Sequence, residues 1–265
     1  MDYPIPYYYI NRDLHFLNEF IQTLPANMDV ILAGGAIRAY FANEKPKDYD
    51  LFFNNEEAFQ HMVNLFDKEK VITPNQFVTE TTQSDYNRVF TSDNAYTYIH
   101  KPTNTVIQLI KKIFGIPEDI ISKFDITACM GAFSFKTRSF VLDKRFIYDI
   151  AARRINFAKD LKYPFATMCR ALKYQEKGYR LSYIDLMVVL LQCHKVKCET
   201  LYDWKEQLLG VDVQYLSELF ESIEAEKKAE HNKEDVSDIQ VSTKDMLELI
   251  LSHIDFVSIA DNSIL

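Results

Sequence analysis

Asp48 and Asp50 are the residues of this sequence best suited to chemistry, because a single residue separates them within an apolar segment. The segment 48–53 predicts a strand. Side chains alternate across a strand, so both carboxylates point to one face while Tyr49 and Leu51 point to the other. Mg²⁺ typically binds one or two carboxylates together with substrate phosphates and water. The spacing therefore predicts that Asp48 and Asp50 bind Mg²⁺ or Mn²⁺.

Two adjacent glycines, Gly34 and Gly35, lie between a short apolar run at 30–33 and an amphipathic stretch at 36–41. This pattern predicts a strand, a tight turn and a helix just before the strand that carries the aspartates. The whole chain has only six glycines, so a pair at such a turn indicates backbone that approaches a ligand closely. N–H groups at the start of a helix attract phosphate. We therefore expect Gly34, Gly35 and the nearby Arg38 to bind phosphates.

Gly34-Gly35-Ala36-Ile37-Arg38, followed by Lys47-Asp48-Tyr49-Asp50-Leu51, resembles the head of the DNA polymerase beta-type nucleotidyltransferase superfamily. The branch it resembles is the tRNA nucleotidyltransferase and poly(A) polymerase group, whose pattern is Gly-Gly-x-Val-Arg-Asp, a short spacer and Asp-x-Asp-Leu. The resemblance implies metal-dependent transfer of a nucleotide from a nucleoside triphosphate to an RNA (tRNA-like) 3′ end. It implies that the two aspartates are catalytic and adds Lys47 to the nucleotide-binding residues. Ala39 departs from the pattern, which has Asp there.

A second resemblance to the same group covers 123–133, Lys-Phe-Asp-Ile-Thr-Ala-Cys-Met-Gly-Ala-Phe. The group's segment reads Arg-Arg-Asp-Phe-Thr-Ile-Asn-Ala-Leu, and its Arg and Asp contact the incoming nucleotide. Asp125 and Thr127 match, whereas Lys123 and Phe124 replace the arginines. The resemblance implies that Asp125 binds nucleotide; the alternative is an N-capping aspartate at a helix-to-strand transition. The group's base-reading Glu-Asp-x-x-Arg has no counterpart here.

A third acid on a later central strand is usual in the superfamily, and this sequence departs from that pattern. The strand predicted at 105–110 places Gln108 on the expected face. A glutamine lends an amide oxygen to a metal but accepts no proton. Either Asp85 or Asp125 serves as the third acid, or the head binds nucleotide without efficient catalysis.

Composition sets broad limits. The chain has 265 residues and a formal net charge of −8, which does not favour a nucleic-acid binder as a whole, although a local basic patch is compatible with it. No signal pattern precedes the first strand and no apolar run reaches membrane-spanning length. Of the four cysteines, Cys193 and Cys198 could form part of a zinc site with His194, but no second cluster of ligands accompanies them. The cysteines therefore predict a reduced protein. We expect a cytoplasmic protein with no membrane partner; composition leaves the oligomeric state open.

The predicted fold class is α/β (α+β): a nucleotidyltransferase-like mixed-sheet head at 1–155 followed by an all-helical C-terminal domain at 156–265. Residues 71–110 read as β-rich, with a hairpin turn at 92–94, and 145–150 as a further short strand. Two functions remain open. The first is an active nucleotidyltransferase; the second is a catalytically weak or inactive module with a binding or assembly role. Segments such as 117–121 resemble phage-encoded relatives, so a virion component is one form of the second function.

Overall fold

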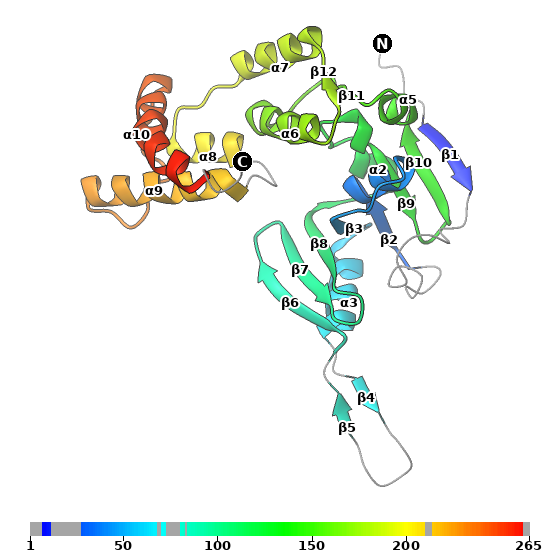
Figure 1. The fold of residues 1–265 in the computed structure, drawn as a ribbon. Coiled ribbons are helices and arrows are strands. Elements are labelled where there is room, and N and C mark those ends of the chain that lie inside the picture. Colours follow the sequence, from blue (N-terminus) through cyan, green and yellow to red (C-terminus); the bar gives the residue numbers. More distant parts are fainter. Residues whose placement is uncertain are drawn as a thin grey trace. The chain divides into compact units, whose positions relative to one another are not determined.

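The computed structural model describes residues 7–11, 28–67, 70–72, 80–82, 84–209 and 214–261. The chain divides into two compact units, Met1–Ala158 and Lys159–Leu265. The first unit is built on a mixed β-sheet with helices, and the second is predominantly helical (Figure 1). The predicted α/β class, with a mixed-sheet head followed by helices, is therefore confirmed.

The main sheet contains eight strands in the order β1-β10-β9-β2-β3-β8-β7-β6. Strands β3 and β8 pair in parallel, and the other neighbouring strands of this sheet pair antiparallel. The bounds are β1 (Tyr7–Asn11), β2 (Val30–Ala33), β3 (Asp48–Phe53), β6 (Tyr86–Thr91), β7 (Ala95–His100), β8 (Thr105–Phe114), β9 (Gly131–Ser134) and β10 (Ser139–Asp143). A separate two-stranded sheet joins β4 (Lys70–Ile72) to β5 (Glu80–Thr82). The predicted hairpin and β-rich character of 71–110 are confirmed for the described residues; 73–79 and 83 lie outside them.

Helices cover both faces of the sheet. The first unit contains α2 (Gly35–Phe41), α3 (Glu56–Asp67), α4 (Pro117–Ile121), the 3-10 turn η2 (Thr127–Cys129), α5 (Phe146–Ala151) and the short strand β11 (Arg154–Ile155). On one face α3 packs its aromatic side chains, with the Phe59 ring 5.5 Å from Phe53 and the Phe66 ring 5.1 Å from Tyr98. On the other face α4 packs Ile120 against the core.

The expected strand at 145–150 is wrong, because this segment forms α5. The segment is rich in β-branched and aromatic residues, which suggests a strand. Its Phe146 and Ile150 are also four residues apart, and both are buried on one side of the helix together with Asp149. Tertiary contacts of this stripe decide in favour of the helix.

The second unit contains α6 (Pro164–Glu176), β12 (Arg180–Leu181), α7 (Tyr183–Lys195), α8 (Leu201–Leu209), α9 (Gln214–His231) and α10 (Thr243–Asp261). Its core gathers Trp204, Phe220, Ile223 and Met246 from α8, α9 and α10. Ser182 caps α7, since its Oγ accepts a hydrogen bond of 3.1 Å from the N–H of Asp185. Within the described part of the chain, no helix is long and apolar enough to cross a membrane.

Candidate functional site

The two aspartates lie in the centre of the main sheet, on β3. Asp48 pairs with Val106, and Asp50 pairs with Gln108 of the parallel strand β8. Directly paired residues point to the same face, and neighbouring strands lie about 4.8 Å apart. Gln108 is therefore the immediate neighbour of Asp50, as the sequence predicts. All three polar side chains are partly exposed.

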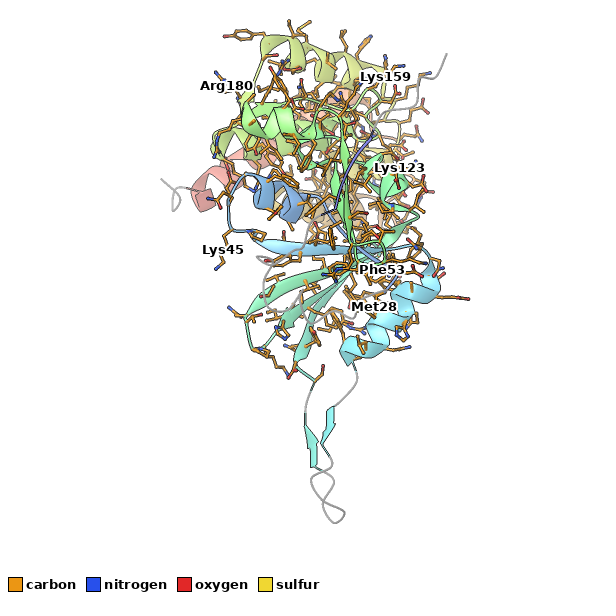
Figure 2. All side chains as sticks on the ribbon, turned by 90° about the vertical axis from the view of Figure 1, so that its right-hand side faces the viewer. Met28, Lys45, Phe53, Lys123, Lys159 and Arg180 are labelled. Atoms are coloured by element: carbon orange, nitrogen blue, oxygen red, sulfur yellow. The ribbon has the colours of Figure 1, made fainter. Side chains whose placement is uncertain are left out.

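The face that carries these side chains is the one on which α4 packs. Phe52 follows two residues after Asp50 on the same strand and belongs to the cluster with Ile120 and Ile121 of α4. Alternation along β3 places Asp48 and Asp50 on that same face. Their partial exposure shows that α4 covers only the far end of the strand. Figure 2 marks the two ends of β3, with Lys45 in the loop before it and Phe53 at its last residue.

The glycine turn reaches the same place from β2. Gly34 is the N-cap of α2 and has a φ of 79°, a backbone conformation that favours glycine. A Cβ placed there would lie 3.3 Å from Cε2 of Phe124 and 3.9 Å from Oδ2 of Asp50. A Cβ on Gly35 would have no heavy atom within 4 Å. A side chain at Gly34 would therefore point toward the Asp50 carboxylate, whereas a side chain at Gly35 would point into open space.

The segment that resembles the second family motif lies against this turn. Phe124 occupies a position where the motif that this segment resembles has arginine, and its ring centroid lies 5.8 Å from that of Phe52. Ile126, not Asp125, is the N-cap of η2, so the N-capping alternative for Asp125 is wrong. Asp125 is partly exposed, and its carbonyl accepts a hydrogen bond of 2.8 Å from the N–H of Ala158.

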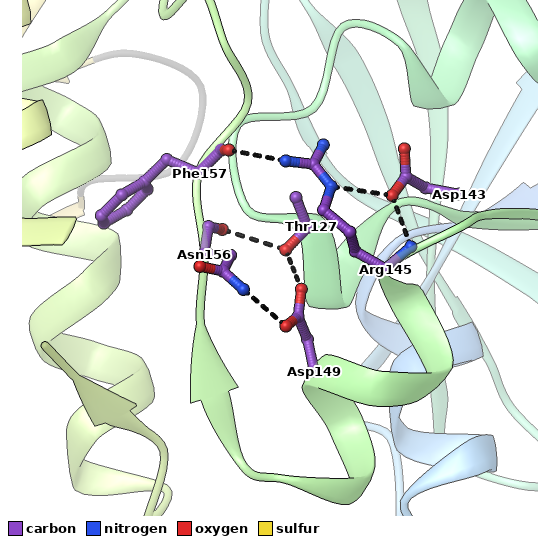
Figure 3. Close-up of polar contacts among 6 residues, drawn as sticks. All are labelled: Thr127, Asp143, Arg145, Asp149, Asn156 and Phe157. Carbon is purple, nitrogen blue, oxygen red and sulfur yellow. Dashed lines mark hydrogen bonds and ion pairs between the residues drawn. The ribbon is translucent and has the colours of Figure 1, made fainter. Parts of the chain in front are cut away.

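A buried polar network holds this segment in place (Figure 3). Asp149 on α5, which is fully buried, accepts hydrogen bonds from Oγ1 of Thr127 and, at 2.6 Å, from Nδ2 of Asn156. The N–H of Thr127 also donates to the carbonyl of Asn156 at 3.0 Å. Burial raises the pKa of Asp149, although its hydrogen bonds oppose that shift. The matched motif residue Thr127 is therefore structural, and it fixes the backbone two residues after Asp125.

A second pair of contacts extends the network toward the start of α5. Asp143 accepts hydrogen bonds from the backbone N–H and from Nε of Arg145, at 2.8 and 3.1 Å. Nη1 of Arg145 donates to the carbonyl of Phe157 at 3.3 Å, so it ties 156–158 to the same helix (Figure 3). Sequence reasoning missed this network. The only available signal was the presence of Asp149 in an apolar stripe.

Arg38 and Lys47 lie in different environments. Arg38 is only 4% exposed, and its Nη1 donates to Oε2 of Glu44 at 2.7 Å. Glu44 also pairs with Nη2 of Arg153 at 3.2 Å. Although burial raises the pKa of Glu44, the hydrogen bond and charge of Arg38 outweigh it and lower the pKa. A phosphate would reach this arginine only if the ion pair rearranged, whereas Lys47 is exposed directly before β3.

The donor set near β3 limits what the site could hold. Among the described residues, no group of three His, Cys, Asp or Glu side chains gathers in metal-binding geometry. Asp85 lies at the start of β6, three strands from β3, so it does not supply a third acid beside Asp50. Two carboxylates and the amide oxygen of Gln108 remain. This set fits Mg²⁺, which completes its shell with water and substrate phosphates.

Comparison with known proteins gives a family and several structural likenesses. The model of the Gabija anti-defense 2 family matches residues 10–153. A protein of Bacillus phage SPbetaL7 named Gabija anti-defense 2 is 29% identical over 204 residues, which cover 77% of this chain and 46% of that protein. The chain thus spans about half the length of this relative.

Two solved structures illustrate the structural likeness. The CCA-adding enzyme of Thermotoga maritima, complexed with tRNA, is 13% identical with a TM-score of 0.42, over 74% of this chain and 47% of that one. A CCA-adding enzyme complexed with CTP is 16% identical with a TM-score of 0.44, over 63% of this chain and 37% of that one.

The family match extends over more than half of the sequence, and the chain therefore belongs to the Gabija anti-defense 2 family.

Proposed function

We propose that this chain is a metal-dependent nucleotidyltransferase that counteracts Gabija defence in the host cytoplasm. One observation carries the enzymatic part of the proposal. Asp48 and Asp50 share a partly exposed face of β3, the Cβ direction of Gly34 points toward the Asp50 carboxylate, and the Cβ direction of Gly35 is open. Carboxylates beside an open backbone turn are suited to bind a metal and a triphosphate together.

The phosphate contacts fall to the residues after Gly34. The N–H of Gly34 already donates to the carbonyl of Gly131 at 3.0 Å, so the expectation that both glycines donate to phosphate needs correction. The first N–H groups of α2, beginning with that of Gly35, have no partner within the helix. Lys47 adds an exposed positive charge before β3, and Asp125 is assigned to the nucleotide's sugar.

The roles of the acids follow from their positions. Asp48 and Asp50 would hold Mg²⁺ or Mn²⁺, and Gln108 would add a neutral oxygen donor. When bound, such ions neutralise charge on the attacking and leaving oxygens of a phosphoryl transfer. The chain itself positions the triphosphate against an acceptor hydroxyl, and pyrophosphate is the leaving group. We propose an RNA 3′ end as the acceptor, because the two motifs resemble those of the tRNA nucleotidyltransferase group.

The anti-defence role is proposed from the name of the phage relative and from family membership. That relative carries additional length that this chain does not match. The enzymatic and anti-defence parts of the proposal are therefore tested separately.

Binding is tested by titrating the protein with each nucleoside triphosphate in a calorimeter, with Mg²⁺ and with EDTA. We expect Mg²⁺-dependent binding that the paired change Asp48→Asn and Asp50→Asn abolishes. Asp93→Asn is the matched control, since Asp93 is an exposed aspartate in the turn between β6 and β7 of the same sheet. Binding that survives the paired change would contradict the metal site.

Transfer and anti-defence are tested with the same variants. Incubation with labelled triphosphates and total RNA should yield labelled RNA for the wild type and for Asp93→Asn only. Triphosphate binding without any transfer would favour the binding-module alternative. Phage plaque counts on cells that carry Gabija defence, with and without the expressed chain, test the biological role. If the paired aspartate variant protects phage as well as the wild type, transfer is not how the chain counteracts the defence.

A further inference from the structure

The face of the main sheet that carries Asp50 continues over β8, β7 and β6, which lie side by side in Figure 1. Asp50 pairs with Gln108 on β8, and Gln108 pairs in turn with Thr97 on β7. Thr97 pairs with Phe90 on β6. Directly paired residues point to the same face, so these four side chains form one row across the sheet. The neighbouring Tyr98 points to the opposite face, where it packs against α3.

This row, which we call the open row, lies beside the part of the sheet that α4 covers. Two residues further along β8, Ile110 belongs to the core cluster to which α4 contributes, and its partner Ala95 packs against that cluster. In the open row, by contrast, Phe90 is 63% exposed and the other three side chains are partly exposed. Strand β6 is the edge of the sheet, and edge strands usually avoid exposed apolar side chains. An uncovered aromatic ring therefore ends the row that begins at Asp50.

The two sides of Asp50 differ in what they bring to the site. On one side Asp50 pairs with Ala33 of β2, and on the other with Gln108 of β8. Ala33 leads into the glycine turn to which the proposed function, on which this inference rests, assigns the triphosphate. The attacking and leaving oxygens of a phosphoryl transfer lie roughly in line, so the acceptor hydroxyl arrives from the β8 side. The rest of the acceptor then lies over β8, β7 and β6.

We propose that the open row binds an unpaired 3′ segment of the acceptor RNA and that Phe90 stacks on one of its bases. Neighbouring strands are about 4.8 Å apart, so three strand spacings place Phe90 about 14 Å from Asp50. A stacked strand advances about 3.4 Å per nucleotide, so a base about four nucleotides from the 3′ end reaches the ring, and fewer nucleotides suffice when the strand is extended. Bases inside a duplex are paired and offer no free face to stack on.

The side chains on this face suit a single strand. Base–aromatic stacking tolerates any sequence, since every base has a π-face, and the amide and hydroxyl groups of Gln108 and Thr97 can hydrogen-bond to bases or sugars. The residues of β6, β7 and β8 that share the face as far as Ile110 are all uncharged: Asn87, Phe90, Ala95, Thr97, Ile99, Val106, Gln108 and Ile110. On these three strands no carboxylate therefore repels the phosphates of the strand.

Positive charge gathers at the end of the sheet where β3 and β8 begin and β7 ends. The loops 45–47 and 101–104 contain three exposed lysines, Lys45, Lys47 and Lys101. Residues 84–85 lie at the same end, because the N–H of Lys101 donates to the carbonyl of Asp85 at 2.8 Å, and Asp85 is the one acid among these loop residues. Lysines attract nucleic-acid phosphates. This local charge favours an RNA strand, although the whole chain carries a formal charge of −8.

The proposal is tested by fluorescence anisotropy of a short labelled oligoadenylate RNA titrated with the full chain. We expect a dissociation constant at least about tenfold higher for Phe90→Ala, as for other stacking residues, and nearly wild-type binding for Phe90→Trp, which keeps a ring. Tyr148→Ala is the matched control, because Tyr148 is 62% exposed and lies on α5, which packs against β10 near the other edge of the sheet. The control should bind RNA like the wild type.

Three results would overturn the proposal. The first is a Phe90→Ala protein that binds the RNA as tightly as the wild type. The second is a blunt RNA duplex of the same length that binds as tightly as the single strand. The third is a wild-type protein that does not bind the single strand at about 100 µM, the weak end of non-specific nucleic-acid affinities.

Hairpin RNAs whose 3′ overhang grows one nucleotide at a time test the distance to the ring. The affinity of the wild type should rise until the overhang has about four nucleotides, and Phe90→Ala should lose the last part of this rise. An affinity that does not depend on the overhang contradicts the placement of the strand.

Titration with triphosphate and Mg²⁺ separates this inference from the proposed function. Phe90→Ala should bind triphosphate like the wild type, because Phe90 lies about 14 Å from Asp50. If the paired aspartate change abolishes triphosphate binding while RNA binding ignores Phe90, this inference alone is wrong. If triphosphate binding survives the paired change, the proposed function is wrong, and the anisotropy of the Phe90 variants still decides whether the open row binds RNA.

Discussion

The adjacent glycines at the start of α2 allow stability and nucleotide binding to be separated. Gly34→Ala puts a methyl group on a backbone with φ of 79° and brings it to 3.3 Å from the Phe124 ring. Such backbone strain costs about 1–3 kcal/mol, and a loss of 2 kcal/mol lowers the melting temperature by roughly 4–8 °C in a domain of this size. We therefore expect Gly34→Ala to lower the melting temperature of the protein.

Gly35→Ala is the opposite case. No heavy atom lies within 4 Å of its new methyl group, and Gly35 is the first residue of α2. Replacing a glycine by alanine where the backbone allows it stabilises by about 0.4–1 kcal/mol. The same methyl group stands where we propose that a phosphate approaches. Triphosphate affinity should fall by about tenfold or more, or about 1.4 kcal/mol, while the melting temperature stays equal or rises.

Melting temperature and calorimetric affinity, measured on both variants, decide the matter. Unchanged triphosphate affinity in Gly35→Ala would refute the assignment of the open side of the turn to phosphate. A Gly34→Ala protein as stable as the wild type would refute the strain reasoning instead. The two failures are independent, because each concerns a different residue and a different measurement.

Three further outcomes follow. Asp48→Asn with Asp50→Asn should abolish Mg²⁺-dependent triphosphate binding and change the free energy of unfolding by no more than about 0.5 kcal/mol, as is usual for partly exposed side chains; chemical denaturation measures this. Gln108→Glu should speed nucleotide incorporation, since general-base help is worth about 10²–10⁴ in rate; a slower variant in the labelled-RNA assay would contradict this role. Burial raises the pKa of Asp149, so the folded state binds its proton more readily, and this stabilising contribution is lost as pH rises through the folded-state pKa. Melting curves of Asp149→Asn should therefore show a flatter pH dependence above about pH 4.

The central part of the site could be predicted because it depends on local patterns. Alternation along β3 sets the face of Asp48 and Asp50, and the apolar runs on either side of the glycines define the strand and the helix. Gln108 was predicted beside them because its strand has the same alternation. The sequence did not predict the register between β3 and β8, and the structure shows that Gln108 pairs with Asp50.

Side-chain contacts that no helical or strand period encodes account for what the sequence did not predict. Arg38 looks like a phosphate ligand from its place in the first turn, yet its partner Glu44 lies beyond the end of α2. The helix α5 depends on burying Asp149 against Thr127, which is remote in sequence, and against Asn156, which lies beyond the end of the helix. No period in the sequence encodes these pairings. These pairings form only when the segment 123–133 packs against 154–158.

The replacement of an expected arginine by Phe124 changes the electrostatics of the site. Phe124 lies against Gly34 and Phe52, at a position where the related motif has a cation. The guanidinium of Arg38 forms an ion pair with the carboxylate of Glu44. Of the residues that we assign to the nucleotide, Lys47 is then the one that supplies an exposed positive charge. Two carboxylates on β3 would repel a triphosphate unless a cation lies between them. Under the proposed function a metal ion would therefore have to offset most of the phosphate charge. For that reason, the dependence of triphosphate binding on Mg²⁺ tests the proposal more directly than the loss of any single basic side chain.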